Sequence, residues 1–259
     1  MKIIVLVKAV LDTAESRRLS RETGLAERTE SGYVLDGMSD RALEAAVAYA
    51  ESADGVEVVT LMVAPEEALA TLRKTLAVGA DRALHIVDPD LVGADIVLTA
   101  QAIAAAVGRE SCDLVIGGET STDGASGMVP AAVAEWAGLA FASGLDEIEI
   151  SPGLVSGVRS DGGGVQTLEV DLPAIVSVTE ALPATRFPNF KGIMAAKKKP
   201  LETLSLADLG LRDDPALVAR SIVLSAEPSP PKPSGIKLVD DGTAADQLAE
   251  YLIESGAIR

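Results

Sequence analysis

The sequence has very few of the residues on which disulfides, metal sites and aromatic cores depend. Of its 259 residues, one is cysteine, one is histidine and 3% are aromatic. Cys112 therefore has no partner for an internal disulfide, as is typical of a reducing cytoplasm, and we expect it to be a small core residue. His85 alone cannot build a metal site or a catalytic triad, so we predict no metal ligands and no catalytic residues.

Positive charge and long hydrophobic runs are also scarce. There are 22 Lys and Arg against 39 Asp and Glu, which gives a net charge of −17. Nucleic acids and anionic membranes attract basic surfaces, so we expect neither as a partner. No apolar run reaches the length of a membrane span, and residues 3–7 have the length of a strand. We therefore expect no membrane insertion and no signal peptide, and a cytoplasmic location.

The sequence is rich in short apolar runs that alternate with helical patterns. Residues 1–8, 56–63, 83–87 and 114–116 are typical of buried parallel strands. This alternation over the first 137 residues predicts an α/β fold with a doubly wound, mostly parallel, Rossmann-like sheet.

Caps and turns set the expected limits of the elements in this half. We expect Ser39 to cap the first helix, Gly79 to end the second and Gly108 to end the third. Residues 9–35 are predicted to be a long polar segment between the first strand and the first helix, and this segment can form a hairpin through residues 33–35.

The pattern changes after residue 145. Alternating residues near 148–150 and 165–170, with a Gly-rich turn at 161–164, predict a small antiparallel hairpin insert. The apolar run 174–179 is then expected to return to the main sheet. Eight of the 13 prolines then follow residue 182. We therefore divide the chain into an α/β domain, 1–182, and a Pro-rich region with an extended C-terminal arm, 183–259; the resemblance given below implies nucleotide binding for the first and a partner-docking loop at the start of the second. Short helices are expected at 204–209 and 244–253, and the scattered apolar residues suggest that this arm wraps its own domain or a partner chain.

The most informative stretch is 112–137. A strand ends at Gly117 and Gly118, a loop of small polar residues follows, and an apolar-periodic helix opens near Gly127 with Trp136 on its face. Such a loop points backbone N–H groups at an anion. It matches neither the dinucleotide fingerprint nor a Walker A loop, and an ordinary βα turn stays a possible reading.

Several blocks in order resemble the β subunit of electron transfer flavoproteins, in particular its actinobacterial members. They are the segment RFPNFKGIMAAKKK at 186–199, the N-terminal IIVLVK, TLRKTLAVGADR at 71–82, STDG at 121–124, and DGGG at 161–164 followed by LPAIV at 172–176. The similarity extends over essentially the whole chain.

The resemblance implies an electron carrier and not an enzyme. It implies a heterodimer with an α subunit, which holds most of one FAD, while the β chain binds a structural AMP in its adenine-nucleotide-binding, Rossmann-like fold. Such a complex takes electrons from acyl-CoA and related dehydrogenases, as in fatty acid oxidation, and passes them to a quinone reductase. The flavin performs the redox chemistry.

The resemblance also implies which residues bind. The AMP site would use the first strand, the segment 36–39, the end of the second strand and the loop after residue 117; its residues are Leu6, Ser39, Val63, Gly118, Asp123, Gly124, Ala125, Ser126 and Gly127. Asp123 would hold the loop or the ribose, and the amides of 124–127 would face the phosphate. The dehydrogenase would dock on Phe190, Ile193 and Met194. Phe190 stands where many members have leucine, and Thr13 where some have an aromatic residue near the flavin.

Three alternatives stay open. A bifurcating relative would bind a second FAD and NADH in place of AMP. A stand-alone adenine-nucleotide-binding module, similar to universal stress proteins, would form a homodimer and leave the Pro-rich tail unexplained. An ATP-cleaving ligase or hydrolase would need a Ser-Gly-Gly-x-Asp loop after the first strand, where this chain has residues 8–12.

Overall fold

A computed structural model describes residues 1–12, 14, 18–28, 32–212, 214, 217–232 and 234–258. The chain divides into two compact units, Met1–Ser225 and Ala226–Arg259. The first unit holds the α/β fold, and the second holds one helix, α6 (Ala244–Glu254). No helix within the described ranges is long and apolar enough to cross a membrane.

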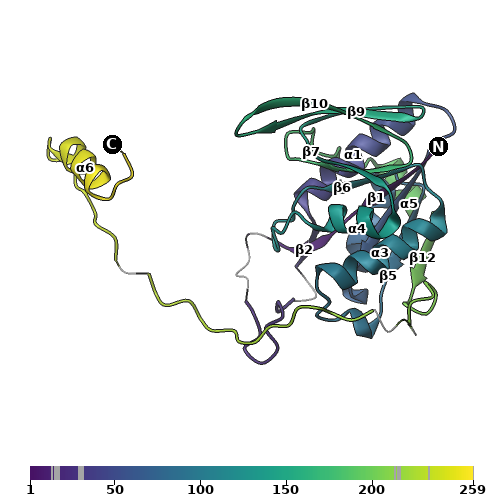
Figure 1. Ribbon diagram of the computed structural model, residues 1–259, viewed down its shortest axis with the longest axis horizontal. Coiled ribbons are helices and arrows are strands. Elements are labelled where there is room, and N and C mark those ends of the chain that lie inside the picture. Colours follow the sequence, from purple (N-terminus) through teal and green to yellow (C-terminus); the bar gives the residue numbers. More distant parts are fainter. Residues whose placement is uncertain are drawn as a thin grey trace. The chain divides into compact units, whose positions relative to one another are not determined.

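The first unit is built on a seven-stranded sheet (Figure 1). Its spatial order is β12-β5-β4-β1-β6-β11-β7, and every neighbouring pair is parallel. The strands are β1 (Lys2–Leu6), β4 (Glu57–Val63), β5 (Arg82–Ile86), β6 (Leu114–Gly118), β7 (Ala140–Leu145), β11 (Ala174–Val178) and β12 (Leu201–Leu204). The chain moves outward from β1 to β5 and then crosses to β6 on the other side of β1. The strand order therefore reverses between β1 and β6, which confirms the doubly wound sheet and gives its switch point.

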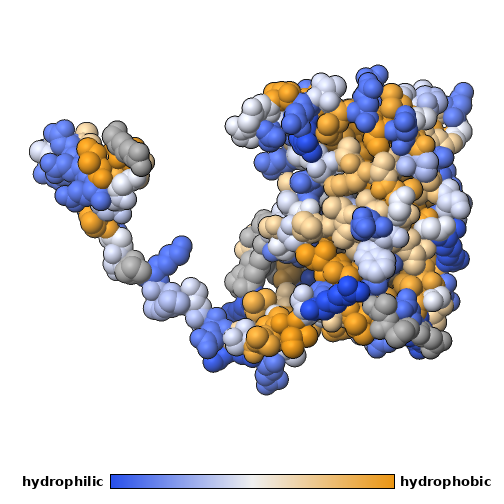
Figure 2. Space-filling model, viewed as in Figure 1, coloured by the Kyte–Doolittle hydropathy of each residue, from blue (hydrophilic) through white to orange (hydrophobic). Residues whose placement is uncertain are grey.

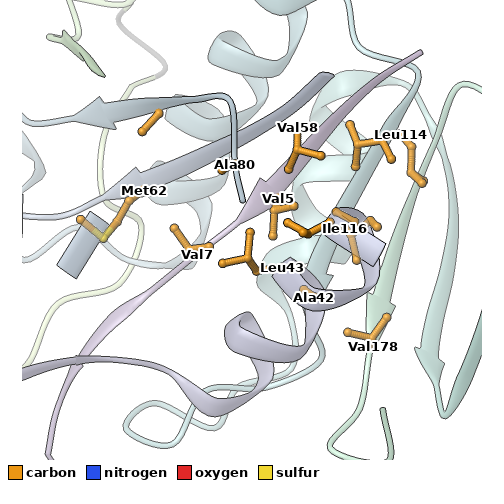
Figure 3. Packing of buried hydrophobic residues seen from close by; sticks show 14 of the residues in the cluster. Val5, Val7, Ala42, Leu43, Val58, Met62, Ala80, Leu114, Ile116 and Val178 are labelled. Carbon is orange, nitrogen blue, oxygen red and sulfur yellow. The ribbon is translucent and has the colours of Figure 1, made fainter. Parts of the chain in front are cut away.

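Helices cover both faces of this sheet. They are α1 (Gly37–Ser52), α2 (Leu69–Val78), α3 (Ile96–Glu110), α4 (Val129–Ala137) and α5 (Phe190–Ala196), with short 3-10 turns η1 (Glu66–Ala68) and η2 (Pro89–Leu91). Buried residues of α1 and α2 share one apolar cluster, and those of α3 and α4 share the other. Figure 3 shows the first cluster, in which Val5 of β1 and Ile116 of β6 lie against Leu43 of α1. Aliphatic side chains dominate both layers, and the few aromatic residues, such as Tyr49 and Phe141, only pack against their borders.

Two small antiparallel sheets accompany the main one. β2 (Ala9–Leu11) pairs with β3 (Tyr33–Leu35), which confirms the expected hairpin. β8 (Glu147–Ser151), β9 (Leu154–Asp161) and β10 (Gly164–Asp171) form the predicted insert in the order β10-β9-β8. β11 then returns to the main sheet beside β6, as its apolar run predicts.

Several predicted element limits were wrong. Asp36 caps α1, because its side chain accepts from the amide of Met38, and Ser39 lies inside the helix. Helix α3 continues through Gly108 to Glu110 and ends at Ser111, whose φ of 48° is left-handed. Glycine is the usual residue at such an end, and here a serine takes the conformation.

The region after residue 182 also differs in part from the prediction. The helix expected at 204–209 is absent; Leu204 ends β12, the edge strand beside β5, and a turn follows it. Leu204 and Leu206 are buried in the first unit, so this part of the Pro-rich region packs on its own domain. Helix α6, in contrast, forms where it is expected. In α4, Val133 is buried but Trp136 is about half exposed, so the predicted apolar face is narrower than expected.

Candidate functional site at the switch point of the sheet

The candidate site lies where β1 and β6 end. Lys8 follows β1, and the loop 119–128 follows β6. The Lys8 Nζ donates to Asp123 Oδ1 at 2.6 Å and to Ser121 Oγ at 3.0 Å. These contacts join two segments more than 110 residues apart across the crevice where α/β sheets bind their ligands.

Asp36 fixes this loop to the first turn of α1. Its Oδ1 accepts from the amide of Thr122 at 2.8 Å and from the hydroxyl of Thr122 at 3.0 Å. Its backbone amide donates to the Lys8 carbonyl at 2.9 Å, and the Lys8 amide donates to Ser39 Oγ at 3.1 Å. The strand exit, the start of α1 and the loop are therefore held as one rigid unit.

Gly118 is required by a close approach of α1. A Cβ at this position would lie 2.7 Å from the Cβ of Met38. The Met38 sulfur in turn accepts from the Thr120 amide at 3.3 Å. The glycine that ends β6 thus lets the first turn of α1 seat against the loop.

The loop has two left-handed residues just before α4. Ala125 has a φ of 47° and Gly127 a φ of 64°. The amide of Gly124 donates to Asp123 Oδ1, and the amide of Ala125 donates to the Ser121 carbonyl. Within the described chain, the amides of Ser126 and Gly127 donate no hydrogen bond. Of the four amides predicted to face an anion, two are therefore used inside the loop and two are open.

Two cations at this site share one carboxylate. Arg28 Nη2 lies 3.8 Å from Asp123 Oδ2, so Lys8 and Arg28 share one carboxylate. Burial opposes ionisation of Asp123, but its bonds with Lys8 and Ser121 outweigh this and hold its pKa below the ordinary value. The other carboxylate at the site, that of Asp36, is bonded to Thr122 and to the Met38 amide, so Lys8 and Arg28 are the cations closest to the open amides and suit the site to an anion.

The structure brings together most of the residues predicted for the nucleotide. Ser39, Gly118 and the loop 123–127 meet at the switch point through the contacts given above, and Leu6 ends β1 on the same edge of the sheet. Val63 is half-buried at the end of β4, the neighbour of β1, on the same edge of the sheet. Thr13 lies outside the described residues.

Sequence reasoning missed the two cations. Lys8 stands two residues after a buried strand, and the rule that ligands sit beyond strand ends was sufficient to select it. Arg28 gave no such signal, because it lies in a polar excursion far from any strand end. The cap at Asp36 was also hidden, because its loop partner Thr122 is 86 residues away.

The predicted docking segment forms a separate site. Asn189 caps α5 by accepting from the amide of Gly192 at 2.8 Å. A Cβ on Gly192 would lie 2.4 Å from the carbonyl oxygen of Ala77, so this glycine lets α5 seat closely on α2. Lys199 Nζ donates to the carbonyls of Leu76, Gly79 and Ala80 at the end of α2, which gives one lysine of the basic run a structural role.

Because α5 packs closely on α2, the apolar side chains on its other face are exposed. Phe190 is 79% exposed, and Ile193 and Met194 are nearly half exposed, while Ala196 is buried against the core. Upstream, Arg186 Nη2 lies 2.6 Å from Glu44 Oε1, and Arg186 Nη1 lies 2.7 Å from Glu51 Oε2. A rigid base thus carries an exposed apolar patch of three side chains, which is the usual chemistry of an interaction surface.

His85 and Cys112 lie away from both sites. His85 is buried, its Nε2 is 2.8 Å from the carbonyl oxygen of Ala64, and burial lowers its pKa. Cys112 is half-buried, and burial raises the pKa of its thiol to about 11, so it is protonated at neutral pH. Both have the surroundings of structural residues.

Comparison with known proteins decides the family. The electron transfer flavoprotein domain matches residues 23–209. The chain belongs to the electron transfer flavoprotein family. It is 42% identical to the electron transfer flavoprotein subunit beta of Mycobacterium tuberculosis (strain ATCC 25618 / H37Rv), over 97% of each chain.

More distant members also align over nearly their full lengths. Identity is 31% to the electron transfer flavoprotein subunit beta of Syntrophomonas wolfei, over 97% of this chain and 96% of the relative. It is 29% to the caffeyl-CoA reductase-Etf complex subunit CarD of Acetobacterium woodii, over 98% and 97%. The similarity to beta subunits therefore includes both the sheet with its switch-point site and the Pro-rich C-terminal region.

Proposed function

We propose that the chain is the β subunit of a heterodimeric electron transfer flavoprotein that holds AMP at the switch point. The observation that carries the nucleotide assignment is the bridge from Lys8 to Asp123 beside two open amides, at Ser126 and Gly127. The residues fit an adenine mononucleotide, because Lys8 and Arg28 supply charge for a phosphate beside the open amides. AMP would serve as a structural ligand and supply no chemistry.

The redox group would be one FAD per heterodimer, held mainly by the α subunit. When bound, the flavin accepts and releases the electrons. We assign no residue of this chain to it, because the segment after β2 that would face it includes Thr13, outside the described residues. The role of the chain is then to shape one wall of the flavin site and to present a docking surface.

Exposed apolar residues support an obligate partner chain. Figure 2 shows apolar side chains at the surface over α4 in the first unit and on α6 in the second. Ile222, Leu224, Ile236, Val239 and Ile253 are each more than half exposed in the C-terminal region. So many exposed apolar side chains are unusual for a chain without a partner, so we infer that the C-terminal arm packs on the α subunit. With a single cysteine and no internal disulfide, we place this complex in the cytoplasm.

The electron donors would be acyl-CoA-type dehydrogenases, and the acceptor a quinone reductase. The name of one relative, a caffeyl-CoA reductase-Etf complex subunit, pairs this type of chain with an oxidoreductase of a CoA thioester. The donor would dock on Phe190, Ile193 and Met194, which α5 presents together.

The experiment is to produce the chain with its α subunit and measure flavin reduction by an acyl-CoA dehydrogenase. Phe190→Ala removes the most exposed anchor, so kcat/KM for the dehydrogenase should fall about thirtyfold, the scale of an interface hot spot. Phe190→Leu keeps an apolar anchor and should retain most of the rate. Flavin content should be unchanged in both. Loss of flavin from Phe190→Ala, or a rate equal to that of the unaltered complex, contradicts the docking role.

A further inference from the structure

The segment 220–223 of the Pro-rich region lies against the hairpin 18–28, which is far from it in the sequence but beside it in the first unit (Figure 1). A Cβ on Gly24 would lie 2.3 Å from Cγ1 of Val223, so the valine rests directly on the backbone of the hairpin. Gly24 also has a left-handed φ of 68°, so the turn and the close approach both favour glycine here. Neither the proposed docking surface nor the core of the sheet explains this contact.

The hairpin 18–28 is itself an ordered element that packs on the domain. Leu19 and Ala26 form an antiparallel bridge. A Cβ on Gly93 would lie 3.3 Å from Cδ2 of Leu25, so the leucine packs on the turn that precedes α3. Contacts with this turn and with the segment 220–223 therefore hold the hairpin in place.

Asp95 fixes the segment 220–223 at the start of α3. Its Oδ2 accepts from the amide of Arg220 at 2.6 Å and from the amide of Ser221 at 2.8 Å. Its Oδ1 caps α3 by accepting from the amide of Leu98 at 2.9 Å. Hydrogen bonds to an ionised acceptor are among the stronger ones in proteins. The two oxygens of one carboxylate thus tie the segment to a helix of the main domain.

The hairpin ends at Arg28, one of the two cations of the switch-point site. Among the residues that the structure describes, the ion pair of Arg28 is with Asp123, and its Nη2 lies 3.8 Å from the carboxylate Oδ2. This distance is too long for a hydrogen bond, so the pair alone does not fix the guanidinium. The position of Arg28 therefore depends on the hairpin that leads to it.

We propose that Asp95 and Val223 are positioning residues of the nucleotide site, because through the segment 220–223 they hold the hairpin 18–28 and thereby place Arg28 beside the phosphate. This inference rests on the proposed AMP site. The Pro-rich region then contributes to nucleotide binding as well as to the contact with the α subunit.

The variant Asp95→Asn releases the segment but keeps the helix cap. The asparagine oxygen still accepts from the first turn of α3, since asparagine caps helices as well as aspartate does. Its amide nitrogen is a donor and cannot accept from the amides of 220 and 221. Val223→Ala is a second variant at a half-exposed position, and it removes the two methyl groups that lie on Gly24.

Asp88→Asn is the matched control, because Asp88 has the same arrangement at another place. One of its oxygens caps η2. The other accepts from the amide of Leu206 at 3.1 Å and lies 3.2 Å from Arg212 Nη2. Asp88 thus anchors an earlier part of the Pro-rich region, before the segment that contacts the hairpin.

The first measurement is AMP affinity of the complex with the α subunit, by isothermal titration calorimetry. Arg28→Gln should lower the affinity about tenfold, Asp95→Asn about fivefold and Val223→Ala about threefold. Asp88→Asn should bind AMP as the unaltered complex does. Asp95→Asn combined with Arg28→Gln should be no weaker than Arg28→Gln alone, because Asp95 acts through Arg28. Independent effects would instead multiply to about fiftyfold.

The second measurement needs no nucleotide. Amide hydrogen exchange in the hairpin 18–28 should be faster in Asp95→Asn than in the unaltered complex and in Asp88→Asn. Unchanged exchange, an AMP affinity of Asp95→Asn equal to that of Asp88→Asn, or independent losses in the double variant would each overturn the inference.

Gly127→Asp in the same titration separates this failure from failure of the proposed function. If Gly127→Asp loses AMP affinity while Asp95→Asn keeps it, the AMP site stands and the positioning role is refuted. If Gly127→Asp binds AMP normally, the phosphate does not lie at this loop, and the inference falls with the site on which it rests.

Discussion

The parallel strands of the central sheet begin at one edge, here called the amino edge, and end at the other, the carboxyl edge. The charged side chains at these two edges are arranged differently. At the amino ends of the strands, Arg82 Nε lies 2.7 Å from Glu57, and Arg82 and Lys2 both bond to Glu110. Two cations and two carboxylates satisfy one another there. At the carboxyl ends, Lys8 and Arg28 share Asp123 beside two open amides. A closed ion-pair network stabilises the fold, whereas an edge with two cations beside open amide donors is suited to bind an anionic ligand.

The burial of the two edges is consistent with this difference. The Glu110 side chain is 10% exposed, and burial raises its pKa, but Arg82 and Lys2 outweigh this and lower it overall. Asp123 is about twice as exposed and has a pKa lowered in the same way by Lys8 and Ser121. Removing a group from the amino edge should therefore cost stability, and removing one from the carboxyl edge should cost binding.

The largest expected effect is on nucleotide binding at the carboxyl edge. Gly127→Asp places a carboxylate where the phosphate is proposed to sit, so AMP affinity should fall about a hundredfold. Gly127→Asn is the matched control, because asparagine has the same shape, also tolerates the left-handed φ of 64°, and carries no charge. Isothermal titration calorimetry with AMP measures both. Unchanged affinity in Gly127→Asp contradicts the phosphate placement.

The second effect is on stability at the amino edge. Glu110→Gln leaves Arg82 and Lys2 without the carboxylate they share, so the free energy of unfolding should fall by about 2 kcal/mol. AMP content should not change. Glu169→Gln, on an exposed strand position, should lie within about 0.5 kcal/mol of the unaltered chain. Denaturant unfolding of the heterodimer measures the free energy of unfolding of both variants. If Glu110→Gln is as stable as the unaltered chain, the ion-pair network contributes little to stability.

A third and smaller effect is expected on AMP affinity at the carboxyl edge. Lys8→Met keeps the length of the side chain but removes its charge, so AMP affinity should fall about tenfold. Lys74→Met, an exposed position on α2, is the control and should bind AMP normally. If Lys8→Met binds AMP as well as the control does, Lys8 serves only to hold Asp123.

The smallest effect is on the pH dependence of stability. The Glu110 pKa is lowered in the folded chain, so its contribution is fully present above its ordinary pKa of 4.5 and is lost as the pH falls further. The stability difference between the unaltered chain and Glu110→Gln should therefore shrink below about pH 4.5. A difference that persists at pH 3 would show that Glu110 acts through packing and not through its charge.

The sequence predicted best what depends on local pattern. The apolar runs of β1, β4 and β11, the turn between β9 and β10, and the end of α2 at Gly79 all follow from spacing within a few residues. β12 was missed because its run at 201–204 follows a proline and carries Glu202, and only pairing with β5 makes it a strand. Its position at the sheet edge explains why such a polar strand is tolerated.

The candidate site was predictable only in outline. Strand ends and glycines pointed to the loop, because a close approach needs small residues. The pairing of Lys8 with Asp123, and of Asp36 with Thr122, depends on contacts between distant segments that no local pattern contains. The use of two loop amides by Asp123 and Ser121 depends on the same contacts, so the number of open donors could not be read from the sequence.

The most direct test is native mass spectrometry of the complex recovered from its own cells, with the released ligands identified. The account predicts one α subunit, one copy of this chain, one FAD and one AMP. Two FAD and no AMP would contradict the nucleotide assignment at the switch point and favour a bifurcating relative. A homodimer that carries only ATP or AMP would contradict the electron-carrier account as a whole.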